Sequence, residues 1–172
     1  MSLHTCLFIR DGNLMGGNNR RARNVRKIYE LLDGYFGKLN WWPADTPFEV
    51  IVGAILTQNT AWRNVVSAIA KLKEAGILSP DGLHFAEPGT LAALIRSSGY
   101  YNVKARRLKA FVGFLQKEHG GNLEDLFSGN PWQIREKLLC INGIGEETAD
   151  SILLYAGKKP VFVVDAYTKR IL

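Results

Sequence analysis

The chain has 172 residues and a formal net charge of +6. Its length favours one domain or two small lobes with a hydrophobic core. Two cysteines and three scattered histidines indicate neither a disulfide framework nor a metal site, and no apolar run reaches membrane-spanning length. The positive charge suits a polyanionic partner, although such an excess is often only a solvated surface. We therefore expect a cytoplasmic protein with no membrane partner.

Residues 1–75 contain three predicted helices. Residues 1–20 are rich in glycine and asparagine, which indicates a flexible arm. Apolar residues recur at helical spacing over 22–36, with basic residues on the other side, so we expect an amphipathic helix. The nearly continuous apolar run 48–56 predicts a buried helix. A further helix is expected over 61–75, after the polar break Gln58-Asn59-Thr60.

Turn-forming residues over 76–89 predict a loop in the middle of the chain. Thr90 is placed to cap a helix over 91–97, and Asn102 is the candidate cap of the following helix. That helix has an apolar stripe, and between Tyr101 and Phe114 it carries four basic side chains and no acidic one: Lys104, Arg106, Arg107 and Lys109. Some of these charges must face solvent in any arrangement.

A glycine turn separates two predicted helices near the C-terminus. Pro131 opens the first, over 132–139, and the second covers 146–155. Gly143-Ile144-Gly145 between them allows positive φ, and the helix that follows exposes unpaired N–H groups that suit an anion. An ordinary turn between packed helices has the same glycine spacing. The turn alone therefore leaves anion binding and simple helix packing open.

Asp165 follows the apolar stretch 161–164 and precedes another predicted helix. Aspartate before a helix is a preferred N-cap, and capping bonds with the helix dipole would keep its pKa low. No strand-like alternation is found outside 161–164, and no internal repeat is present. An all-α architecture is therefore expected.

The glycine turn and Asp165, about twenty residues apart, resemble the helix-hairpin-helix DNA glycosylases of the endonuclease III superfamily. The resemblance implies the all-α HhH-GPD fold, with a six-helix-type core and an incomplete second helical lobe. It also implies double-stranded DNA with damaged bases as partner. The implied roles are DNA binding for Gly143, Ile144, Gly145 and Thr148, and catalysis for Asp165. An ionised carboxylate would stabilise the positive charge that develops on the deoxyribose.

The resemblance also divides the chain into parts. These are a flexible N-terminal arm (1–20), a helix belonging to the second lobe (21–43), a helical core (44–157) with the helix-hairpin-helix at 132–155, and the start of the Asp165 segment and second lobe (158–172). Family members continue for several dozen residues, so we expect a fragment, or a shortened relative whose exposed apolar surface is covered by oligomerisation or a partner. Many members hold an iron–sulfur cluster through cysteines of that later segment. No cofactor is therefore expected in these residues.

The run WWPADTPFEVIVGAILTQNTAW resembles one branch of the superfamily, the bacterial 3-methyladenine DNA glycosylase III group. In that group the WWP segment and an aromatic residue after Gln-Asn-Thr line the base pocket. The resemblance thus implies a pocket of Trp41, Trp42, Pro43 and Trp62. Alkylated purines carry positive charge, which aromatic faces attract by cation–π contact. Paired tryptophans are also common core residues.

Glu147 departs from the pattern of bifunctional family members, which carry a lysine at this position and use its amine to form a Schiff base. A carboxylate cannot form an imine, so a monofunctional glycosylase is expected. Glu146 and Glu147 also place negative charge beside the proposed phosphate site. Two alternatives stay open: a DNA-binding module without turnover, and a bifunctional enzyme that uses Lys158 or Lys159.

Two further positions are assigned to DNA by the resemblance. Gln58 stands where relatives of endonuclease III insert a glutamine into the gap left by the extruded base, but it is also an ordinary polar helix end. The segment SGYYNVKARRL, 98–108, resembles the family's turn near the DNA backbone. It implies phosphate contacts from Lys104 and Arg107.

Overall fold

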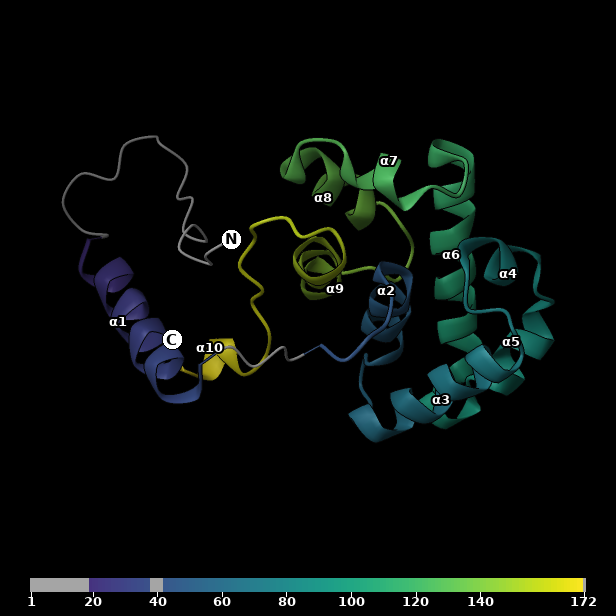
Figure 1. The fold of residues 1–172 in the computed structure, drawn as a ribbon, viewed down its shortest axis with the longest axis horizontal. Helices are drawn as coiled ribbons and strands as arrows, with labels where there is room; N and C mark the ends of the chain where they lie inside the picture. The colour runs from purple at the N-terminus through teal and green to yellow at the C-terminus, as the bar shows by residue number, and fades with distance from the viewer. Residues whose placement is uncertain (1–18, 38–41, 172) are drawn as a thin grey trace.

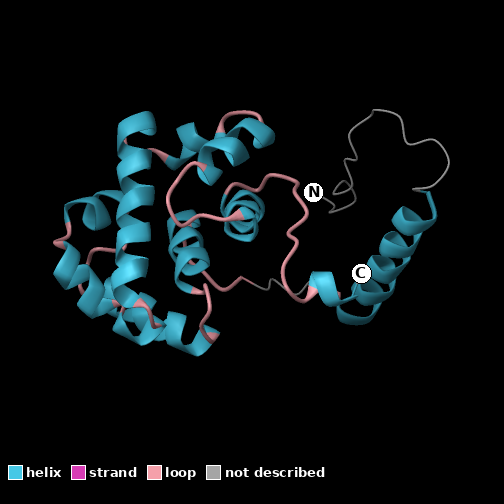
Figure 2. Cartoon of the chain, turned by 180° about the vertical axis from the view of Figure 1, so that it is seen from behind, coloured by secondary structure: helices cyan, strands magenta, loops and turns pink. Residues whose placement is uncertain are grey.

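The computed structural model describes residues 19–37 and 42–171, and these residues contain helices and no strand (Figures 1 and 2). The predicted all-α fold is confirmed. Trp41 and nearly all of the predicted N-terminal arm lie outside the described residues. The α-helices are α1 (Asn19–Phe36), α2 (Pro47–Leu56), α3 (Trp62–Glu74), α4 (Pro80–Phe85), α5 (Pro88–Leu94), α6 (Tyr101–His119), α7 (Leu123–Phe127), α8 (Pro131–Leu139), α9 (Glu146–Ser151) and α10 (Thr168–Ile171). A 3-10 turn, η1 (Arg96–Ser98), precedes α6, and a π turn, η2 (Ile152–Ala156), continues α9.

Several helices begin at a capping residue followed by proline. The hydroxyl of Thr46 accepts a hydrogen bond from the backbone N–H of Glu49 at 3.1 Å, and Pro47 opens α2. The same arrangement starts α4 and α8, at Ser79-Pro80 and Asn130-Pro131. Because proline lacks the N–H that would be unpaired in the first turn, it fits this position without loss. These starts fix the helix boundaries locally.

Two predicted caps are wrong. Thr90 lies inside α5, because Pro88 opens that helix and the carboxylate of Glu87 accepts from the Gly89 N–H at 2.8 Å. Asn102 lies in the first turn of α6, which the chain enters through Tyr100 in the left-handed conformation, with φ of 45°. The loop predicted over 76–89 contains α4, and the apolar stretch 161–164 is a loop with neither helix nor strand.

Helix α2 lies at the centre of the core. Every residue from Phe48 to Leu56 is buried, as the continuous apolar run predicts. Helices α3, α6 and α9 and the turn η2 pack around it, while α4 and α5 cover the far side of α6 (Figure 1). The ends of α2 and α9 are therefore held by the core, and Gln58 and the glycine turn lie at these ends.

Helix α1 lies apart from this block, and α10 is beside it in both views (Figures 1 and 2). The helix predicted over 22–36 is confirmed, but five of its large apolar side chains are exposed: Tyr29, Leu31, Leu32, Tyr35 and Phe36. No helix in the described ranges combines the length and apolar character that a membrane span requires.

Candidate functional site

The turn between α8 and α9 adopts a conformation that requires glycine at its first position. Gly143 has φ of +88°, and a Cβ atom there would lie 2.3 Å from Cγ of Arg107. Ile141 and Ile144 are buried beneath the turn. Gly145 caps α9 without a side-chain hydrogen bond, so the helix start is not blocked by its own cap. This geometry agrees with the predicted helix-hairpin-helix.

An ion pair missed in the sequence holds the two helices of the hairpin together. Nε of Arg135 on α8 donates to Oδ1 of Asp150 on α9 at 2.6 Å, and its Nη2 donates to Oδ2 at 3.1 Å. Asp150 raises the pKa of the Arg135 guanidinium through this bond. Because the partners are fifteen residues apart on different helices, no local pattern indicates their pairing. The pair therefore ties α9 to α8 on either side of the turn.

Asp165 lies at the start of α10, as predicted. Its Oδ1 accepts hydrogen bonds from the backbone N–H and the hydroxyl of Thr168, both at 2.7 Å. The backbone bond from Thr168 is the largest cause that lowers the pKa of Asp165 below its ordinary value of 3.8, against a smaller opposing effect of burial. The carboxylate is half-buried and ionised at neutral pH. Thr168 is a supporting residue that the sequence analysis did not identify.

Three aromatic rings form a cluster over α2. The rings of Trp42 and Trp62 meet edge to face with centroids 5.7 Å apart. The rings of Trp42 and Tyr155 are tilted against each other with centroids 5.0 Å apart. A Cβ atom at Gly53 would lie within 3.5 Å of both indoles, so a glycine makes room for them on the helix. Tyr155, on η2, was missed because its approach to Trp42 depends on the packing of η2 against α2.

Of the predicted base pocket, the structure brings together Trp42 and Trp62. Both are half-buried, and Pro43 beside them is exposed. Trp41 lies outside the described residues. The assignment of these residues to a base pocket stays a prediction. Tyr155, which was not among them, packs against Trp42.

Gln58 links the loop after α2 to the glycine turn. Its amide nitrogen donates to the carbonyl of Gly143 at 3.1 Å and to the hydroxyl of Thr148 at 2.9 Å. Its amide oxygen accepts from Nη1 of Arg107. Thr148 is buried, so in this structure its side chain is not accessible for the predicted contact with DNA. The structure thus gathers four predicted DNA residues into one hydrogen-bonded cluster.

The prediction that Lys104 contacts a phosphate is wrong. Its side chain is 1% exposed, and its ammonium donates to the carbonyls of Leu56 at 2.8 Å and Ser98 at 2.6 Å. Burial lowers the pKa of Lys104, and the nearby charge of Arg107 adds to the effect. Its ammonium is directed into the protein, where it pairs the carbonyl at the end of α2.

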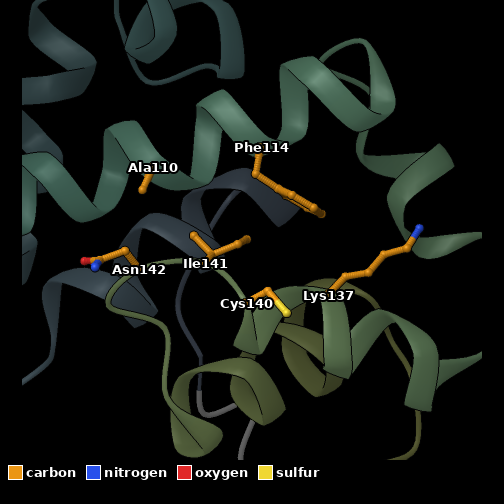
Figure 3. A pocket seen from close by; sticks show the side chains of 6 residues that line it. All are labelled: Ala110, Phe114, Lys137, Cys140, Ile141 and Asn142. Carbon is orange, nitrogen blue, oxygen red and sulfur yellow. The ribbon is translucent and has the colours of Figure 1, made fainter.

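A cavity of about 370 Å³ lies between α6 and the stretch where α8 enters the turn (Figure 3). Ala110 and Phe114 on α6 face Ile141 and Asn142 across it, and Lys137 and Cys140 complete its wall. None of the predicted site residues lines this cavity. Within the described part of the chain, no group of three or more His, Cys, Asp or Glu side chains could hold a metal ion.

The sequence and the fold of the chain both resemble those of known DNA repair proteins. The sequence model of the HhH-GPD superfamily of base excision DNA repair proteins matches residues 52–172. A Methanocaldococcus jannaschii protein named as a DNA repair glycosylase is 50% identical over 147 residues, which are 85% of this chain and 67% of that protein. The H. pylori 3-methyladenine DNA glycosylase, solved with 1,N6-ethenoadenine, is 36% identical with a TM-score of 0.70, covering 86% of this chain and 68% of that one.

The fold is also shared with a trapped endonuclease III–DNA covalent intermediate. The TM-score is 0.71, and the match covers 91% of this chain and 68% of that chain. At 20% identity, this likeness concerns the fold alone.

Proposed function

The chain belongs to the HhH-GPD superfamily of base excision DNA repair proteins, and we propose that it removes alkylated purines of the 3-methyladenine type from double-stranded DNA without cutting the backbone. Its enzyme class is DNA N-glycosylase. The observation that carries the proposed chemistry is the capped carboxylate of Asp165, whose pKa is lowered by Thr168.

Asp165 supplies the negative charge that hydrolysis of an N-glycosidic bond needs. As the bond between base and sugar breaks, positive charge develops on the deoxyribose, and a fixed anion stabilises it. The bonds from Thr168 already orient Oδ1, so little reorganisation is needed during the reaction. The same carboxylate orients the attacking water.

The aromatic cluster supports an alkylated purine as substrate. Trp42, Trp62 and Tyr155 lie together, and aromatic faces attract a base that carries positive charge. An alkylated purine also has a weakened glycosidic bond, so excision does not require a strong general acid. The H. pylori relative at 36% identity is named a 3-methyladenine glycosylase, which favours the same substrate class here.

The glycine turn supports the proposed binding of DNA. Backbone N–H groups near the start of α9 suit a phosphate, and contacts of this kind fix the position of the protein without reading bases. Glu146 and Glu147 are exposed in the first turn of α9 and repel the DNA backbone. The proposed hairpin contact is therefore weak, and the net charge of +6 supports it over a longer range.

Glu147 is the basis for the monofunctional assignment, because it cannot form the Schiff base through which bifunctional enzymes cut the strand. Borohydride trapping on duplex DNA with an abasic site tests this. The wild-type chain should release alkylated bases and give no covalent adduct. A Glu147→Lys variant provides the matched amine-bearing comparison. A stable adduct with the wild-type chain would show that an amine such as that of Lys158 or Lys159 attacks the sugar, and would overturn the assignment.

A further inference from the structure

Arg107 and Gln58, both expected to contact DNA, are bonded to each other in this structure. Nη1 of Arg107 donates to the amide oxygen of Gln58, and both side chains are half-buried. Gln58 in turn holds the carbonyl of Gly143 and the hydroxyl of Thr148. One amide therefore joins the loop after α2 to three residues that lie 49, 85 and 90 positions from Gln58 along the chain.

The orientation of the Gln58 amide is determined by its partners. A guanidinium can only donate, so the amide oxygen must face Arg107, and a backbone carbonyl can only accept, so the amide nitrogen must face Gly143. With Thr148 as second acceptor, both N–H groups of the amide are used. A residue with these bonds satisfied inside the protein holds its position more tightly than a free surface glutamine would.

Arg107 also contacts the turn through its aliphatic stem. A Cβ atom at Gly143 would lie 2.3 Å from Cγ, 2.5 Å from Cδ and 2.6 Å from Nε of Arg107. The stem therefore lies directly on the bare face of the glycine. Lys104, one helical turn earlier on α6, holds the end of α2 from the same helix through the carbonyl of Leu56. Two basic residues of α6 thus hold the loop and the turn from within.

We propose that Arg107 is a positioning residue that, acting through Gln58, fixes the glycine turn against the loop after α2, and that it is not a phosphate ligand. The inference rests on the proposed function only in taking DNA as the ligand of the turn. For Gln58 to fill the gap left by a base, its bonds to Arg107, Gly143 and Thr148 must first open.

Hydrogen exchange on the free protein tests, without DNA, whether the hydrogen bonds of Arg107 and Gln58 hold the glycine turn in place. Arg107→Met and Gln58→Leu should each accelerate amide exchange over residues 143–149 by about tenfold, the size expected for losing a hydrogen bond to a charged group. The double variant should show no further acceleration, because both changes open the same network. Arg106→Met removes the same charge from the neighbouring exposed position and serves as control. Unchanged exchange at the turn, or effects that multiply in the double variant, would overturn the proposal.

Salt dependence of binding to undamaged duplex DNA separates positioning from phosphate contact. For a phosphate ligand, loss of one contact lowers the slope of log K against log salt by about 0.9. Arg107→Met should weaken binding and leave the slope equal to that of wild type. A slope reduced by about 0.9 would make Arg107 a phosphate ligand and contradict the inference. If the wild-type chain binds no DNA, the proposed function fails. The exchange measurement would still show whether Arg107 positions the glycine turn through Gln58.

Discussion

Asp165 serves as a helix cap and as the proposed catalytic anion through the same hydrogen bonds. Thr168 gives its backbone N–H and its hydroxyl to one carboxylate oxygen. Both bonds favour the ionised form, which is also the form that accepts them best. Capping and catalysis are therefore compatible at this residue, since each requires the carboxylate to be unprotonated.

Removing the hydroxyl of Thr168 should raise the pKa of Asp165 toward its ordinary value of 3.8. Thr168→Val keeps the backbone N–H and the side-chain shape, so only the hydroxyl bond is lost. Because the folded-state pKa is lowered, the stability that this group contributes is present above its unfolded pKa and is lost as pH falls through the folded value. In the variant that loss, and the acid limit of excision, should move to higher pH.

An NMR titration of the Asp165 carboxyl measures this shift directly. Thr168→Ser retains a hydroxyl and is the matched control, with a pKa close to that of wild type. An unchanged pKa in Thr168→Val would show that the hydroxyl has no part in holding the anion.

Trp62 should contribute to selection of the base. Trp62→Leu removes one aromatic face and the edge-to-face contact with Trp42. Loss of a cation–π contact worth about 0.5–2 kcal/mol predicts roughly a 2- to 30-fold fall in kcat/KM for an alkylated base. Trp132→Leu, at an exposed tryptophan on α8, should leave excision unchanged. Equal effects of the two substitutions on excision kinetics would argue against a base pocket at Trp62.

Residues whose environment is local were predictable, and residues held by distant partners were not. The position of Asp165 at a helix start follows from its neighbours in sequence, and the structure places it there. Lys104 has an ordinary surface-lysine context in sequence, yet it is buried against carbonyls of Leu56 and Ser98. Its partner in α2 is 48 residues away, so no local pattern could indicate it.

At the scale of elements, the glycine turn depends on one glycine more than on the other. Gly143 has φ of +88° with Arg107 against its open face, whereas Gly145 has φ of −93° and nothing within 4 Å of an added Cβ. Gly143→Ala should therefore lower the free energy of unfolding by about 1–3 kcal/mol through backbone strain and displacement of Arg107. Gly145→Ala should change it by less than about 0.5 kcal/mol. Urea denaturation measures both.

A Gly143→Ala variant as stable as wild type would mean that the turn relaxes without cost. The hydrogen bonds between Gln58 and the turn would then restrain the turn only weakly, because the carbonyl of Gly143 accepts one of them.

Most helices were predictable from their apolar period or their start signals, and two short ones, α4 and α7, were not. The buried run of α2 and the proline start of α8 match the prediction within one or two residues. Helices α4 and α7 have six and five residues, too few for a period to show, and they lie in turn-rich sequence. Their formation depends on packing against α6, which the sequence does not display.

For the whole molecule, the two sides of the structure carry different parts of the proposed site. The block around α2 holds the glycine turn and the aromatic cluster, while Asp165 lies on the segment that leads to α10 beside α1 (Figure 1). Apolar side chains of α1 are exposed on that side. Catalysis as proposed requires both sides at once, so activity should depend on their arrangement more strongly than does the stability of the block.

Release of alkylated bases from methylated duplex DNA by the wild-type chain and by Asp165→Asn tests the central proposal most directly. The amide of asparagine still caps α10 but carries no charge. We expect base release by the wild type, a fall of about 10²-fold or more in Asp165→Asn, and equal DNA affinity for the two proteins. Undiminished base release by Asp165→Asn would contradict the proposal.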